Sequence, residues 1–212
     1  MTHLGWELMP YELCSEVNAA FWEELAQAAP QELCRRSGAR CVPEGYLLPF
    51  LNRELTLLPR ERRLLDPARP ETDPGFRLCL TSLLYLLKVD PAALGPPVSP
   101  LELAGGATFF RGQHGLPHAA LENRFGEDPE ALLAAGRRLG GEVRPAGDAA
   151  LAFQVFPGLW VEVVLWRGDE EFPPQASFAV PAHLDRFWHL DAVWGLLNLV
   201  VQELIAAASK HA

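Results

Sequence analysis

A chain of 212 residues is long enough for one domain with its own core, and its 49% apolar and 21% charged residues exclude a disordered or fibrous protein. Acidic residues outnumber basic ones by 27 to 18, which gives a net charge of −9. This balance argues against a surface for nucleic acid or anionic membranes, because such surfaces need clustered lysine and arginine. We therefore expect a single acidic, globular domain over residues 1–212.

Targeting segments are not expected in this sequence. Glutamates from Glu7 to Glu24 interrupt the N-terminal region, which lacks the basic and apolar parts of a signal peptide. The most apolar stretch, Ala192–Gln202, contains Asn198 and ends before Glu203, so it is shorter than the roughly 20 residues that span a bilayer. We expect a cytoplasmic protein with no membrane and no nucleic-acid partner.

The four cysteines follow no metal-binding pattern. There is no C-x-x-C pair and no zinc or iron–sulfur spacing among Cys14, Cys34, Cys41 and Cys79. In a reducing cytoplasm this pattern predicts four free thiols, mostly small core residues, and no metal site. A shared ligand or redox role for Cys34 and Cys41 is the alternative.

Helical spacing of apolar residues and helix-capping signals predict five helices. Each of two Asp-Pro pairs combines an N-cap aspartate with a proline in the first turn. Apolar side chains surround most of the last helix, which we expect to be buried in the core or against a partner chain. The predicted helices are Pro10–Ala28, a short one ending at Ser37, Asp73–Lys88, Asp128–Leu139 and Leu190–Ser209.

Alternating apolar residues predict a mainly antiparallel sheet. Ala149–Phe156 and Leu159–Trp166 flank the turn dipeptide Pro157-Gly158, so we expect a hairpin with Val161 and Val163 buried. Both faces of the second strand are apolar, which predicts a central strand covered on both sides. Further predicted strands are Gln175–Val180 and the hairpin Tyr46–Leu51 and Glu54–Leu58, in which Pro49 indicates an edge. Together with the helices, these strands predict an α+β fold, with N-terminal helices and a buried C-terminal helix.

A glycine-rich segment, Gly105–His114, is the first candidate site. Its glycines let the backbone approach an anion, and Arg111 offers a planar fork for a carboxylate or phosphate. His114 could carry a proton, and Phe110 could anchor the loop beside the ligand. The alternative is a loop whose phenylalanines fill the core while its polar groups are hydrated.

An acidic turn that follows the tryptophan-rich strand is the second candidate site. Asp169, Glu170 and Glu171 could bind a cation or divide acid and base roles between them, unless they are simply a hydrated strand end. Because a desolvated arginine needs a counter-charge, we expect Arg111 and this turn to share one site and to be coupled through charge.

Glu162 is the third candidate, because it lies among apolar residues of a predicted strand. If Phe156 lies opposite Leu159, Glu162 faces Phe153. A carboxylate with apolar neighbours in a cleft is typical of a catalytic acid or base. The alternative is an edge residue that reaches water.

Several motifs of the chain are similar to those of an uncharacterised prokaryotic family, the domain of unknown function 3786. They are Gly-Gly-x-x-Phe-Phe-Arg-Gly-x-His at Gly105–His114, Leu139-Gly-Gly, Gly147-Asp148, and Trp-x-Gly-Asp-Glu-Glu-Phe-Pro at Trp166–Pro173. The resemblance implies no established activity. Some members of the family carry an additional iron–sulfur-type cysteine segment and occur in anaerobes. This chain lacks such a segment, which argues against electron transfer.

These features favour a domain that binds a small molecule or a cofactor of unknown identity, in a pocket formed by the Phe109–His114 loop and the Asp169–Glu171 turn. An enzyme is the alternative, with Glu162 or Glu171 as acid or base, His114 as proton carrier and Arg111 as anion clamp. A further alternative is an assembly or accessory protein for a redox or corrinoid system. The apolar C-terminal helix could also form a homo-oligomer. Convergence of the candidate residues would favour binding or catalysis, and scattering would favour assembly.

Overall fold

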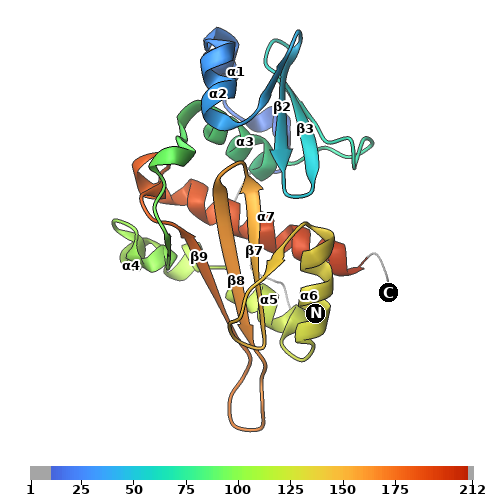
Figure 1. Cartoon of the computed structure of the whole chain (residues 1–212), viewed down its shortest axis with the longest axis vertical. Coiled ribbons are helices and arrows are strands. Elements are labelled where there is room, and N and C mark those ends of the chain that lie inside the picture. Colours follow the sequence, from blue (N-terminus) through green and yellow to red (C-terminus); the bar gives the residue numbers. More distant parts are fainter. Residues whose placement is uncertain (1–10, 210–212) are drawn as a thin grey trace.

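The computed structural model describes residues 11–209 and has the expected α+β architecture (Figure 1). The longer helices are α1 (Ala19–Gln27), α2 (Pro30–Ser37), α3 (Phe76–Lys88), α5 (His118–Phe125), α6 (Pro129–Arg138) and α7 (Leu190–Ser209). Short helices are α4 (Gly106–Phe109), η1 (Cys14–Glu16), η2 (Pro91–Ala93), η3 (Pro100–Glu102), η4 (Gly112–His114) and η5 (Leu184–Arg186).

The strands form two antiparallel sheets, one of four strands in the order β1-β2-β3-β4 and one of five in the order β5-β9-β8-β7-β6. The first sheet comprises β1 (Arg40–Val42), β2 (Gly45–Phe50), β3 (Arg53–Leu58) and β4 (Arg63–Leu65). The second comprises β5 (Pro97–Val98), β6 (Glu142–Val143), β7 (Ala149–Phe156), β8 (Leu159–Trp166) and β9 (Gln175–Pro181). The Leu51 N–H donates to the Val155 carbonyl over 3.1 Å and joins the two sheets.

The first helix is shorter than predicted. Residue 10 lies outside the described residues, and the chain forms the turn η1 before α1 begins at Ala19. Asn18 starts α1, because its side-chain oxygen accepts the Ala20 N–H over 2.9 Å. The side chain of Asn18 therefore caps the N-terminus of α1, so that one continuous helix does not run through η1 into α1.

Pro49 does not place its strand at an edge, so that prediction was wrong. β2 lies between β1 and β3, but β1 pairs only with Gly45–Leu47. Pro49 lies beyond the end of β1 and faces Glu54 of β3 on its other side. The missing N–H of proline therefore costs no hydrogen bond of the sheet.

The hairpin of β7 and β8 is confirmed, with Val161 and Val163 fully buried. Phe156 pairs with Leu159 as expected, but a bulge between Gln154 and Phe156 shifts the rest of the register. Glu162 consequently pairs with Ala152 instead of Phe153.

The expectation that both faces of β8 are covered was wrong. Trp160, Glu162 and Val164 are partly exposed, and Trp166 is 43% exposed. The opposite face belongs to the core, where α6 packs against β7 and α5 packs against β9. β8 is therefore central within its sheet but open on the tryptophan side.

The C-terminal helix α7 is buried, as predicted, and packs against α3, α5 and α6 while it crosses behind the second sheet (Figure 1). Among residues 11–209, α7 is the one helix long and apolar enough to cross a membrane, with a mean hydropathy of 1.5. However, 67% of its apolar stretch is buried within the fold, which is typical of a core helix.

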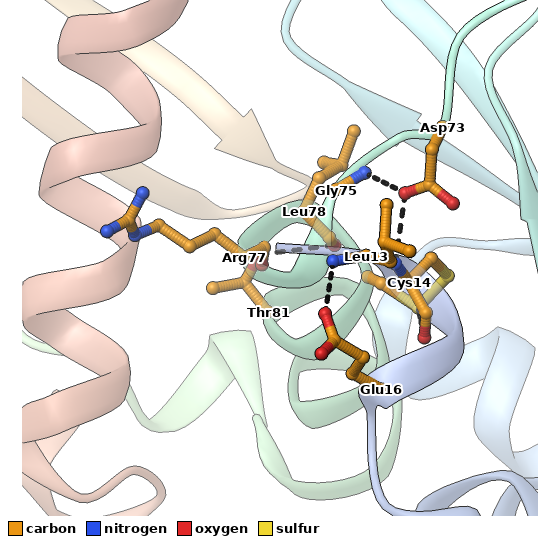
Figure 2. Close-up of a disulfide and its surroundings, with 9 residues drawn as sticks. Leu13, Cys14, Glu16, Asp73, Gly75, Arg77, Leu78 and Thr81 are labelled. Carbon is orange, nitrogen blue, oxygen red and sulfur yellow. Dashed lines mark hydrogen bonds between the residues drawn. A yellow bond between two sulfur atoms is a disulfide. The ribbon is translucent and has the colours of Figure 1, made fainter. Parts of the chain in front are cut away.

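The prediction of four free thiols was wrong, because the cysteines form two disulfides. Cys14–Cys79 joins η1 to α3 across 65 residues, and Cys34–Cys41 joins α2 to β1 across 7 residues. Around the first disulfide, Asp73 Oδ1 accepts the N–H groups of Cys14 and Gly75, and Glu16 accepts the Leu13 N–H (Figure 2). Spacing rules recognise cysteines only at short, fixed separations such as C-x-x-C. They therefore miss a disulfide partner that is distant in the chain and near only in the fold, as Cys79 is to Cys14.

Tyr85 of α3 ties three parts of the chain together. Its hydroxyl lies 2.6 Å from the carbonyl oxygens of both Ser37 and Pro157, and its ring stacks on Phe156 with centroids 4.7 Å apart. Replacing Tyr85 with phenylalanine should lower the free energy of unfolding by about 1–3 kcal/mol, since the two carbonyls lose the single O–H donor that lies between them. Urea titration measures this loss.

Tyr46→Phe is the matched control, because the hydroxyl of Tyr46 reaches its acceptor only at 3.5 Å. Equal losses from the two variants would contradict the role of Tyr85.

Burial also raises the pKa of the Tyr85 hydroxyl. The contribution of the protonated Tyr85 hydroxyl to the free energy of unfolding is fully present below about pH 10, the ordinary tyrosine pKa. It is lost as the pH rises further, through the raised pKa of the folded protein. Tyr85→Phe should weaken this alkaline dependence.

Candidate functional site

The glycine-rich loop forms α4 and η4 beside the start of α7. Phe110 is buried, whereas Arg111 is exposed and forms no ion pair within residues 11–209. His114 is 46% exposed and stacks on Phe109 with ring centroids 4.5 Å apart. Its Nε2 lies 4.0 Å from Asp191 Oδ1, at the exposed start of α7. The loop is thus anchored by its phenylalanines and presents Arg111 and His114 to solvent.

The acidic turn connects β8 to β9 at the far end of that hairpin (Figure 1). Asp169 Oδ1 accepts the N–H groups of Glu171 and Phe172 over 2.8 and 2.7 Å, and these bonds lower the pKa of the Asp169 carboxyl. Asp169 therefore shapes the turn, while Glu170 and Glu171 are exposed.

The structure does not bring the loop and the turn together. The loop precedes α5, whereas Gly168 donates its N–H to the carbonyl of Gly126, the residue that follows α5. The two candidates therefore lie at opposite ends of an eight-residue helix, about 12 Å long. No ion pair joins Arg111 to Asp169, Glu170 or Glu171 in the described part of the chain. Within residues 11–209, α5 therefore separates the two segments that were expected to form one pocket.

Glu162 lies in a cleft of about 290 Å³ on the open face of the second sheet. Trp160 lies beside it on the same face of β8, and Arg144 approaches from the segment between β6 and β7. Within residues 11–209, Glu162 forms no hydrogen bond to a side chain and no ion pair. The other lining residues are Pro91, Leu94, Gly95, Pro97, Gly158 and Pro181.

The sequence analysis missed a buried ion network that joins the first sheet to α7. Arg53 of β3 donates from Nε to Asp66 over 3.0 Å and from Nη2 to Glu203 over 2.9 Å. Arg69 reaches the other oxygen of Glu203 over 2.6 Å. The carboxylates are only 2% and 3% exposed. A glutamate within an otherwise apolar helix was the available signal, because a buried charge requires a partner.

The comparisons agree with the motif analysis. A family model described as "Domain of unknown function (DUF3786)" matches residues 29–203.

The chain belongs to this family. No curated protein and no solved structure gave a significant match. The DUF3786 region contains the Trp160–Glu162 cleft and the whole ion network, whereas Cys14 precedes it. The Cys14–Cys79 disulfide thus fastens an N-terminal segment to the DUF3786 domain.

No group of three or more His, Cys, Asp or Glu side chains that could hold a metal ion occurs within residues 11–209. The second histidine of the glycine-rich region, His118, begins α5 and stacks on Phe178 with ring centroids 5.1 Å apart. Burial lowers the pKa of this imidazole. His118 is therefore part of the packing between α5 and β9.

Proposed function

We propose that the chain is a ligand-binding domain and that the Trp160–Glu162 cleft takes a small organic cation. The observation that carries this proposal is the placement of Glu162, a carboxylate without a partner among residues 11–209, in one cleft with the indole of Trp160. An indole face attracts cations through its quadrupole, and a neighbouring carboxylate adds a full opposite charge.

The surrounding charges favour a cation over an anion. The one basic residue in the cleft, Arg144, is already paired with Glu142 over 2.8 Å. Glu162 therefore supplies the uncompensated charge. The net charge of −9 also attracts cations from a distance.

The walls of the cleft are stiff before any ligand enters. Pro91, Pro97 and Pro181 line it, and proline fixes its own backbone angle. Gly158 has a φ of +72°, and a Cβ there would lie 2.7 Å from the Cβ of Pro91. The β7–β8 turn therefore rests directly on the Pro91 segment. A preformed site loses little conformational entropy on binding.

Choline and its uncharged isostere 3,3-dimethylbutan-1-ol provide the test. We expect choline to shift the Trp160 indole signal in NMR titrations and the neutral alcohol to have little effect. In isothermal titration calorimetry, which does not depend on the Trp160 signal, Glu162→Gln and Trp160→Leu should each weaken choline binding about tenfold, the equivalent of about 1.4 kcal/mol.

Trp166→Leu is the matched control, since Trp166 lies on the same face of β8 but outside the cleft. Its substitution should leave the affinity for choline unchanged. Equal binding of choline and the alcohol, or equal losses from Trp160→Leu and Trp166→Leu, would contradict the proposed cleft.

The enzyme alternative loses support from this geometry. Glu162, Glu171 and the loop that carries both Arg111 and His114 lie on separate surfaces, whereas acid–base catalysis needs groups within hydrogen-bond reach of one substrate position. Their scattering favours the assembly or accessory role as the second candidate. The exposed end of the β8–β9 hairpin supports it, because Phe172 is 62% exposed there beside Glu170 and Glu171.

Phe172→Ser tests that second candidate. It should leave the unfolding temperature and choline binding unchanged while removing a partner that native mass spectrometry detects on protein from its own host. A complex that survives this substitution would count against the hairpin end as an interface.

The cytoplasmic location stays a prediction from the sequence. The two disulfides argue against that location, because reducing compartments keep most thiols reduced.

A further inference from the structure

A second cavity, of about 320 Å³, lies between the first turn of α3 and the middle of α7. We propose that it binds a small organic carboxylate through the guanidinium of Arg77. This site is separate from the Trp160–Glu162 cleft and does not depend on it. The cavity is lined by Tyr11, Glu12, Pro74, Gly75, Phe76, Arg77, Leu78, Leu199 and Gln202.

Arg77 has a desolvated charge without a counter-charge. Its Nε is buried without a hydrogen-bond partner, and its side chain forms no ion pair within residues 11–209. In Figure 2 the side chain extends away from Asp73 and Glu16 toward α7. The guanidinium carbon lies 5.5 Å from the ring centroid of Trp194 on α7. Burial lowers the pKa of Arg77.

A second arginine that is largely buried, Arg53, shows what Arg77 lacks. Arg53 is paired with both Asp66 and Glu203. An uncompensated charge in a partly dry site is unfavourable, so an anion from solution would relieve the cost. The flat guanidinium fork matches the two oxygens of a carboxylate.

The walls of the cavity favour an organic carboxylate over inorganic phosphate. Tyr11 stacks on Phe76 with ring centroids 5.1 Å apart, and Leu78 and Leu199 add apolar surface. Glu12 also lines the cavity but forms no ion pair with Arg77. Its negative charge repels a phosphate dianion more than a monocarboxylate with an apolar body.

Benzoate and its neutral isostere benzamide provide the test, with inorganic phosphate as the third probe. Isothermal titration and the Trp194 indole signal should show saturable binding of benzoate, and binding of benzamide and phosphate at least about tenfold weaker. Arg77→Met should abolish benzoate binding, and Arg77→Lys should retain part of it. Arg137→Met, at an exposed arginine of α6, should leave it unchanged.

Stability without ligand separates this proposal from a purely structural role. If Arg77 lacks a counter-charge, Arg77→Met should unfold at the same temperature as the parent or a higher one. A fall in unfolding temperature, together with no benzoate binding by the parent, would overturn the proposal. It would also be overturned if Glu7→Gln were needed before benzoate could bind, because Glu7 would then be the resident partner of Arg77. If phosphate bound as tightly as benzoate, the proposed selectivity of the cavity for an organic carboxylate would be refuted.

Discussion

Glu203→Gln is expected to lower the free energy of unfolding by about 3–5 kcal/mol, the usual loss when one partner leaves a buried ion pair. Glu203 is 3% exposed and accepts hydrogen bonds from Arg53 and Arg69 on both of its oxygens. Without that charge, Arg53 keeps only the carboxylate of Asp66, and Arg69 keeps no carboxylate partner among residues 11–209. Guanidinium chloride titration measures the loss.

Glu54→Gln is the control for this prediction. The Glu54–Arg40 pair has a similar length, 2.9 Å, but its side chains are 40% and 67% exposed. An exposed pair of this kind contributes about 0–1 kcal/mol. A loss below about 1 kcal/mol for Glu203→Gln would show that the network adds little to the stability of the fold.

Removal of the Cys14–Cys79 disulfide by serine substitution at both positions should cost about 4 kcal/mol. The reason is loop closure, because the disulfide joins residues 65 apart and so restricts a large part of the unfolded chain. The Cys34–Cys41 bond closes a loop across only 7 residues, so its removal should cost about 2–3 kcal/mol. Denaturant titrations of the two double-serine variants compare these losses directly.

The reducing agent dithiothreitol gives an independent check. The parent should lose stability in its presence, whereas a variant without any cysteine should not respond. A parent equally stable with and without the reductant would show that the disulfides do not form in solution. Since Tyr11 and Glu12 line the Arg77 cavity, loss of Cys14–Cys79 should also weaken benzoate binding.

The sequence was sufficient to predict the helices and strands that depend on residues close together in the chain. The alternation of Leu159–Trp166 and the turn at Pro157-Gly158 were enough to predict the hairpin and the burial of Val163. Asp128 caps α6 as expected, because its carboxylate accepts the Ala131 N–H three residues later. Such bonds depend only on neighbours in the chain.

The site could not be predicted in the same way. A single bulged residue near Val155 moved Glu162 opposite Ala152, and no sequence pattern marked that bulge. The partners of Cys14 and Arg53 lie 65 and 150 residues away in the chain. The pairing of Arg111 with the acidic turn failed for a related reason, because charge complementarity along a sequence carries no information about the helix that lies between.

The position of Glu203 has a consequence for the synthesis of the chain. Arg53 leaves the ribosome about 150 residues before Glu203 does, and α7 follows the other helices of residues 11–209 in the chain. Contacts of such long sequence separation form late in folding. In a nascent chain, β3 and the Arg69 segment therefore lack their contacts with Glu203 until α7 has been synthesised. During that interval its unpaired charges and uncovered leucines are open to chaperones and proteases.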